Sequence, residues 1–221
     1  MQFEDKLTYE KRECGICHFS WYYPKFNEEV LTPIEKLFYL QIDICPNCKY
    51  TSEDVTQIMD GEEELMKTKE YEDIIKSKNT KYALVCHRES YICLAYAFLK
   101  ERLHQLGLAG KAYLVASEIE TMQYKTYLNS SLYNEKYDEE MIEESKKNVA
   151  KYAQKGLNNI LAYAEQKGEL DIKDYLLISY AYVKNGEKEN SLKYLSQALK
   201  LKPTEDLIDI IQSINNMAKE L

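Results

Sequence analysis

Four cysteines near the start of the chain carry the clearest chemical signal in this sequence. They form two Cys-x-x-Cys pairs, Cys14-Gly-Ile-Cys17 and Cys45-Pro-Asn-Cys48. The short spacing lets the backbone of each pair turn around one metal ion, and two such turns supply four thiolates in a tetrahedron. Zinc is the metal that favours this ligand set. The sequence therefore predicts one zinc ion bound by Cys14, Cys17, Cys45 and Cys48.

A zinc ion with four cysteine ligands is expected to be structural. Catalytic zinc keeps one position for water or substrate, whereas four thiolates fill the coordination shell. In small domains, metal binding supplies much of the folding free energy, with apparent values of roughly 10–16 kcal/mol in zinc-finger peptides. We therefore expect residues 1–60 to depend on zinc for folding.

Other roles for the first cysteine pair stay open in the sequence. Cys14-Gly-Ile-Cys17-His18 matches the Cys-x-x-Cys-His signature of covalent haem attachment. That role needs export, for which the N-terminus shows no signal, and it leaves the second pair unexplained. A thioredoxin-like redox role would need a surrounding βαβ unit, which the pattern does not predict. The remaining alternative is four unligated thiols. With zinc, His18 is expected beside the site or as a donor to it.

The charge balance argues against nucleic acid and membrane as partners. The chain has 29 Lys and Arg against 37 Asp and Glu, a net charge of −8, and residues 1–60 contain 6 basic and 11 acidic residues. Such a surface repels phosphate. The longest uncharged apolar run, residues 91–99, is too short to span a bilayer. We expect a soluble, cytoplasmic protein, where cysteines serve as metal ligands or buried thiols.

The pattern around the cysteines predicts a small zinc ribbon. Residues 37–44 alternate between apolar and polar side chains, which is typical of a half-buried strand that leads into Cys45. A shorter run at 19–23 predicts a strand leaving Cys17, and residues 24–33 are expected to form a loop. The first 60 residues are therefore predicted to form a small β domain.

From residue 61 to 221 the pattern changes to helical spacing. Gly and Pro number only 7 and 4 in the whole chain, and charged residues make up 30%. The acidic run 62–64 is interpreted as a solvated helix start, and Cys86 and Cys93, seven residues apart, as part of a core. The expected helices are residues 62–76, 81–105, 111–133, 138–167, 172–184, 188–201 and 204–219.

Residues 172–203 resemble a tetratricopeptide repeat (TPR), in which two antiparallel helices carry large and small residues at set positions. The matching positions are Tyr175, Ile178, Ser179 and Tyr182 in the first helix, Gly186 at the turn, and Ser191, Leu195, Ala198 and Pro203 in and after the second. A lone repeat cannot bury its apolar face, so earlier helices should stack on it and 204–219 should cap it. The predicted fold is mainly α, a TPR-like antiparallel helical solenoid preceded by the small β zinc ribbon. An ordinary helical hairpin is the alternative.

The TPR resemblance implies partner contact on the inner side of the first helix. The residues it assigns there are Lys173, Leu176, Tyr180, Val183 and Lys184. TPR proteins that clamp a terminal carboxylate carry Lys and Asn where this chain has Leu176 and Tyr180. Apolar contact with an amphipathic helix or an extended peptide is therefore expected. The alternative is that the chain's own helices cover this stripe.

The whole layout resembles a bacterial family of unknown function. The resemblance rests on both cysteine pairs, the strand running into Cys-Pro-x-Cys, Tyr50 just after it, and the TPR-like end of the chain. Members usually carry Pro after the first cysteine and Gly after the last, where this chain has Gly15 and Lys49. The resemblance implies zinc and a bacterial cytoplasm, but no reaction.

These observations favour a non-enzymatic zinc-binding scaffold with a protein or peptide partner. One alternative is an enzyme whose site assembles in the helical region around His87, Arg88, Glu89 and Tyr91. Another is a nucleic-acid adaptor that uses the ribbon, although the local charge argues against it.

Overall fold

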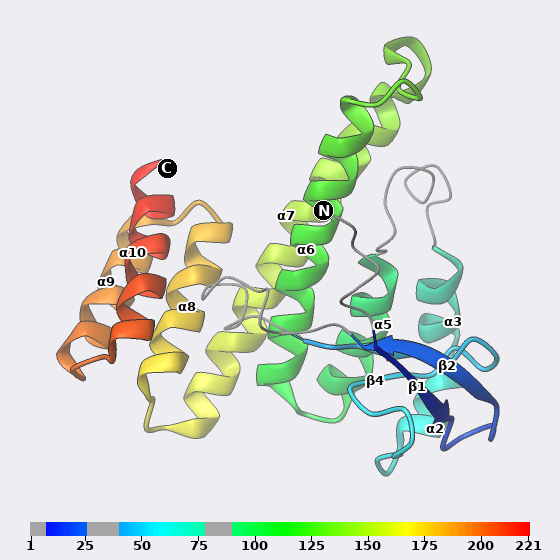
Figure 1. Cartoon of the computed structure of the whole chain (residues 1–221). Coiled ribbons are helices and arrows are strands. Elements are labelled where there is room, and N and C mark those ends of the chain that lie inside the picture. The colour runs from blue at the N-terminus through cyan, green and yellow to red at the C-terminus, as the bar shows by residue number, and fades with distance from the viewer. Residues whose placement is uncertain (1–7, 26–39, 78–89) are drawn as a thin grey trace.

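The computed structural model describes residues 8–25, 40–77 and 90–221 (Figure 1). Its β structure consists of two antiparallel hairpins. β1 (Thr8–Glu13) pairs with β2 (Ser20–Lys25), and β3 (Asp43–Ile44) pairs with β4 (Thr51–Ser52). Each hairpin turn contains one Cys-x-x-Cys pair, so the strands bring the cysteines to two tight turns.

The predicted strands are confirmed in part. β2 covers most of the predicted run at 19–23 and extends to Lys25, so the first two residues of the predicted 24–33 loop lie in this strand. The predicted strand at 37–44 is represented by the two residues of β3, because Leu40 to Ile42 are not part of a strand and 37–39 lie outside the described residues.

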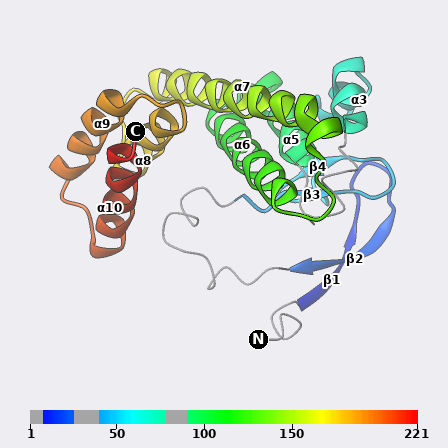
Figure 2. The same ribbon diagram turned by 90° about the horizontal axis from the view of Figure 1, so that it is seen from above.

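Helices make up most of the described chain, which confirms the mainly α prediction. They pack as antiparallel neighbours in a row, with the hairpins, α2, α3 and α5 at one end and α9 and α10 at the other (Figures 1 and 2). Their bounds are α2 (Glu62–Met66), α3 (Lys69–Lys76), α5 (Ser90–Arg102), α6 (Leu106–Leu128), α7 (Glu135–Lys167), α8 (Ile172–Lys184), α9 (Lys188–Lys200) and α10 (Glu205–Lys219). Within the described ranges, none of the helices has both the length and the apolar character that crossing a bilayer demands.

The helix predicted at 62–76 is instead two helices, α2 and α3. Thr68 lies between them in an extended conformation, and its hydroxyl accepts a hydrogen bond from Tyr71 N at 3.4 Å. A threonine in this position caps a new helix, so the chain starts α3 in a new direction. The apolar spacing alone did not reveal this break.

The prediction that a helix starts at Lys111 was wrong, because α6 begins at Leu106 and contains Gly107 and Gly110. These glycines allow close packing. A Cβ on Gly110 would lie 2.6 Å from the Ile160 side chain, and a Cβ on Gly156 of α7 would lie 2.8 Å from Leu114. The expected helix began only after these two glycines because glycine has a low helix propensity, but here glycine lets α6 and α7 approach closely.

The predicted ends of α8 and α9 are confirmed to within one residue. Asp171 and Asp174 form a capping box at the start of α8, and Gly186, with a φ of +75°, follows its end. Ser179 and Ser191 are fully buried, and their hydroxyls lie 2.9 Å apart where α8 meets α9. The structure thus shows an antiparallel hairpin with two small residues at its contact, and α10 packs against both helices.

The hairpins share a core with the first helices. Tyr50 and Val55 are fully buried in a cluster that also contains Tyr71, Phe98 and Leu99. The division of the chain at residue 60 stays a prediction, and the side chains on its two sides pack together.

Candidate metal centre

The four predicted ligands come together at one point between the two hairpins. The Sγ atoms of Cys14 and Cys48 lie 3.6 Å apart, as do those of Cys17 and Cys45. All four sulfurs lie within 4.8 Å of one another. Sulfurs placed about 2.3 Å from a central zinc ion form a tetrahedron with edges of about 3.8 Å. The cluster therefore has the size of a four-thiolate metal site.

The first cysteine pair sits in a tight turn closed by two backbone hydrogen bonds. The amide of His18 donates to Cys14 O at 2.9 Å, and the amide of Cys14 donates to Phe19 O at 2.9 Å. These bonds reverse the direction of the chain after Cys17. The turn therefore holds both sulfurs on its inner side.

The second pair repeats this arrangement. Lys49 N donates to Cys45 O at 3.0 Å, and Cys45 N donates to Tyr50 O at 2.8 Å. The residue after the second cysteine of each pair has a left-handed backbone, with φ of 56° at His18 and 66° at Lys49. Glycine adopts this conformation without a steric penalty, whereas other residues do not. Both turns thus hold a non-glycine residue where glycine would fit best.

Gly15 is required for a third segment to reach the cluster. Its amide donates to Val55 O at 2.9 Å, and a Cβ at this position would lie 2.8 Å from Thr56 O. Asp54 closes that segment by accepting from Thr56 N at 3.0 Å and from Gln57 Nε2 at 2.9 Å. Residues 54–58 therefore pack against the first cysteine turn. This contact was not predicted from the sequence.

Burial and hydrogen bonding affect the four thiols differently. Cys14 and Cys45 are fully buried, and Cys17 and Cys48 are half-buried. The Asn47 amide, 3.5 Å from the Cys17 sulfur, is the main cause that lowers the pKa of Cys17 to about 6. Burial raises the pKa of Cys14 and of Cys48. Thiolates are the ligand form, so a bound divalent cation would offset the cost of ionising these buried groups.

Two buried ion pairs lie beside the cluster. Lys100 Nζ lies 2.8 Å from Glu62 Oε1, and the hydroxyl of Tyr50 donates to the other oxygen of Glu62. Arg12 of β1 pairs with the fully buried Asp43 of β3. The first pair joins the ribbon to α2 and α5, and the second joins the two hairpins.

The interpretation of residue 62 as part of a solvated helix start was wrong, because Glu62 is fully buried. Glutamate in a first helical turn is normally exposed, so the sequence pattern carried no sign of burial. Lys100 directly follows the apolar run 91–99 in α5, and this position is the one signal that a buried carboxylate partner was needed.

His18 is not among the clustered groups. Its side chain is 77% exposed and its Nδ1 lies 3.5 Å from a Glu13 oxygen. The second cysteine pair adjoins the first, which favours a four-cysteine metal site over haem attachment or a two-cysteine redox site. Cys93 is buried, as predicted, whereas Cys86 lies outside the described residues.

The predicted partner-binding stripe lies inside the protein. Leu176, Tyr180 and Val183 are at most 6% exposed. The hydroxyl of Tyr180 donates to Glu118 of α6, and Lys184 Nζ lies 2.7 Å from a Glu118 oxygen. These contacts favour the alternative in which the chain's own helices cover the stripe. Lys173, the remaining predicted residue, is exposed.

The proposed alternative catalytic residues His87, Arg88 and Glu89 lie outside the described residues, and Tyr91 is half-buried in α5. The structure therefore adds nothing to that hypothesis.

Comparisons of this chain with protein-family models, curated proteins and solved structures give no match. What the structure shows is a cluster of four cysteines, able to hold a metal ion, on two β-hairpins, followed by a helical domain.

Proposed function

We propose that this protein is a non-enzymatic scaffold with one structural zinc ion, whose helices bind a protein or peptide. The observation that carries the proposal is the spacing of the four sulfurs, which matches a tetrahedral zinc site. Four thiolates leave no coordination position for substrate, so the metal would stabilise the ribbon rather than catalyse a reaction.

The TPR-like character of the helical region is part of the proposal. It is supported by the buried Ser179 and Ser191 at the contact of α8 and α9, and by α10 packing over both. A TPR-like unit without catalytic groups is suited to binding another protein. The bacterial origin rests on the resemblance of the sequence layout alone.

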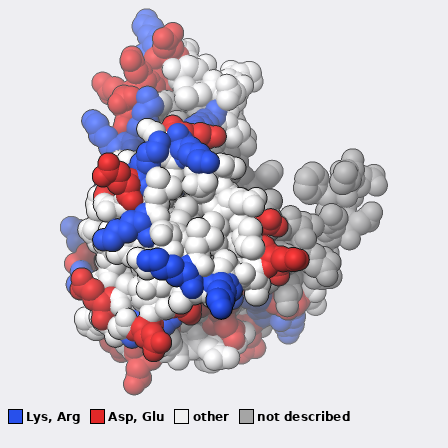
Figure 3. All heavy atoms as spheres, turned by 90° about the vertical axis from the view of Figure 1, so that its left-hand side faces the viewer, with Lys and Arg blue, Asp and Glu red and all other residues white. Residues whose placement is uncertain are grey.

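The outer side of the α9 and α10 pair is the surface we propose for the partner. Leu199, Leu201 and Ile208 are 52%, 46% and 37% exposed. Figure 3, which views the molecule from this end, shows lysines and carboxylates around a broad uncharged area. An uncharged area with a charged border, at an end of the molecule that also carries exposed apolar side chains, is typical of protein contact surfaces.

Elemental analysis after purification under reducing conditions tests the zinc assignment. We expect about one zinc per chain, and cobalt in its place should give the visible bands of a thiolate-bound tetrahedral ion. Cys17→Ser should lower the metal content, whereas Cys93→Ser, which changes a buried thiol outside the cluster, should not. Metal-free protein, or metal retained in Cys17→Ser at the wild-type affinity, would contradict the site.

The surface proposal is tested by placing a charge on this surface and measuring partner capture from the native host. Leu199→Glu should abolish capture of a partner while helical content and zinc content stay unchanged. Leu132→Glu, at an equally exposed leucine on the turn between α6 and α7, is the matched control. Equal capture by both variants would remove the α9 and α10 surface from the proposal.

A further inference from the structure

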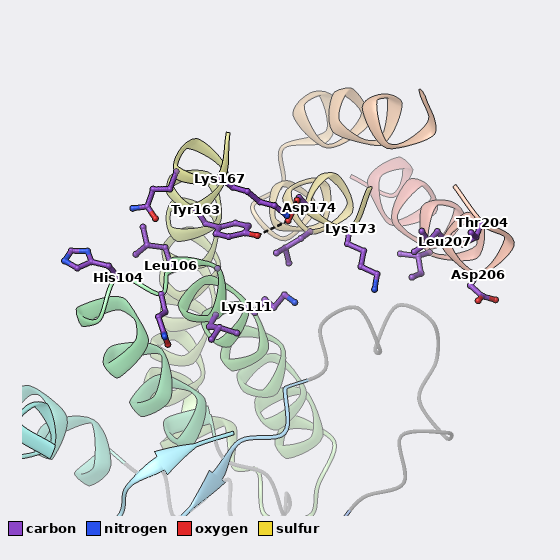
Figure 4. Close-up of a pocket in the computed structure, with 16 residues that line it drawn as sticks. His104, Leu106, Lys111, Tyr163, Lys167, Lys173, Asp174, Thr204, Asp206 and Leu207 are labelled. Atoms are coloured by element: carbon purple, nitrogen blue, oxygen red, sulfur yellow. Dashed lines mark hydrogen bonds and ion pairs between the residues drawn. The ribbon is translucent and has the colours of Figure 1, made fainter. Parts of the chain in front are cut away.

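A cavity of about 1100 Å³ opens between four helix ends, away from the cysteine cluster. The first turns of α6, α8 and α10 and the last turns of α7 line it (Figure 4). This volume is slightly above the usual range for small-molecule sites in proteins, which is about 300–1,000 Å³.

One part of the cavity wall is apolar. Leu177 and Ile210 are 3% and 6% exposed, and Leu207 is half-buried beside them. The ring of Tyr163 closes the wall at α7, where it lies against Gly107 and would be 3.1 Å from a Cβ at that position. The cavity can therefore accept a hydrocarbon chain or a ring.

The charged groups in the cavity wall differ in whether they have an ion-pair partner. Asp174 is almost fully buried and is engaged by Lys167 Nζ at 2.5 Å and by the Tyr163 hydroxyl at 3.3 Å. Lys111 of α6 and Lys173 of α8 make no ion pair with any carboxylate of the described residues. Asp206, the other carboxylate of the wall, is exposed at the start of α10. Two ammonium groups therefore remain for a ligand.

The positive charges of Lys111 and Lys173 are close enough to influence each other. Figure 4 shows Lys111 and Lys173 extending from neighbouring helices toward the space between them. Burial is the main cause that lowers the pKa of Lys111, and the positive charge of Lys173 acts in the same direction. The carboxylates of Glu53, Asp171 and Asp174 act against them. A half-buried cation that makes no direct ion pair is unfavourable, and a second cation nearby adds repulsion, so an anion between the two would stabilise both.

We propose that this cavity binds a small organic anion. Its carboxylate or phosphate group would lie between Lys111 and Lys173, and its apolar body would pack on Leu177, Leu207 and Ile210. The inference is independent of the zinc site and of the partner surface.

Calorimetric titration of the full-length protein with hexanoate, hexyl phosphate, inorganic phosphate and hexanol tests this inference. At least one of the two amphiphilic anions should bind about tenfold or more tightly than hexanol, because each ammonium contact adds a charge-assisted bond. The stronger of hexanoate and hexyl phosphate identifies the head group. Inorganic phosphate should bind more weakly than hexyl phosphate, since it lacks the apolar body.

Lys111→Gln and Lys173→Gln should each weaken binding of the preferred anion about tenfold and leave hexanol unchanged. Lys125→Gln, at an exposed lysine on the far part of α6, is the matched control and should bind like the wild type. Lys173 is exposed, so its variant keeps the test valid even if Lys111→Gln does not fold. Absence of anion binding, binding of hexanol as tight as that of the anions, or unchanged binding in Lys173→Gln would overturn the proposal.

Discussion

The metal centre and the α8–α10 unit show two ways of stabilising a small piece of chain. Around the cysteines the strands are only two to six residues long, and two tight turns aim four sulfurs at one point. In α8–α10 no metal ligands are clustered; instead Leu176, Ile178 and Ile214 lie in a continuous apolar core. Where short strands bury little apolar area, metal ligation can replace it, whereas three helices bury enough without it.

The two regions are not fully separate in how they are stabilised, because the ribbon also packs against the helices. Tyr50, next to the second cysteine turn, is fully buried in a cluster with Phe98 and Leu99 of α5, and its hydroxyl donates to Glu62. The ribbon is thus stabilised both by its cysteine cluster and by a hydrophobic core that it shares with the helices. The following experiments measure how far the two regions depend on each other.

The largest expected effect is loss of the ribbon on removal of one ligand. Cys45→Ser should unfold the hairpins, because one ligand is lost and the metal contributes much of their folding free energy. The protein's single tryptophan, Trp21, lies in β2 and packs on the core that the ribbon shares with the helices, so its fluorescence reports the packing of the ribbon.

We expect the tryptophan emission of Cys45→Ser to shift to the red while circular dichroism retains most of the helical signal. Cys93→Ser is the control for loss of a buried thiol outside the cluster. A parallel collapse of helical signal would show that the shared core makes the ribbon and helices one folding unit.

Tyr180→Ala tests the helical side of the comparison. Because Tyr180 is 6% exposed, removing its ring should lower the free energy of unfolding by about 3–5 kcal/mol. Tyr180→Phe keeps the ring and loses the bond to Glu118, so its cost should be nearer 1 kcal/mol. Chemical denaturation followed by circular dichroism measures both. Tyr137→Ala, at a tyrosine 72% exposed on α7, should change stability by less than about 0.5 kcal/mol. If Tyr180→Ala changes the free energy of unfolding only slightly, Leu176, Tyr180 and Val183 would again be candidates for an open binding groove.

Gly110→Ala tests the contact between α6 and α7, which joins the two regions. The new methyl would overlap the Ile160 side chain, so we expect a loss of about 1–3 kcal/mol despite the better helix propensity of alanine. Thermal unfolding compares it with Ile160→Ala and with the two changes combined, because Ile160→Ala removes the overlapping Cγ1 atom. A stabilised Gly110→Ala variant would mean that the helices lie further apart.

The smallest expected effect is a gain in the ribbon. Lys49 holds a left-handed backbone with φ of 66°, so Lys49→Gly should relieve about 1 kcal/mol of strain and slow zinc loss to a chelator. Lys11→Gly, at a lysine within β1, should instead weaken the ribbon. Faster metal loss from Lys49→Gly would show that the contact of Lys49 Nζ with Pro46 O, at 2.6 Å, matters more than backbone strain.

The sequence by itself determined the features that depend on residues close together in the chain. The ligand set followed from two short cysteine spacings, and the ends of α8 and α9 followed from Gly186 and Pro203, because metal turns and helix ends are local. Only the tertiary structure decided which side chains are buried. Glu62 looked solvated, Gly110 looked like a breaker and Tyr180 looked available to a partner, and each is enclosed by a segment distant in sequence. The cavity with Lys111 and Lys173 likewise exists only where α6 and α8 meet, since burial and pairing depend on neighbours that no local pattern encodes.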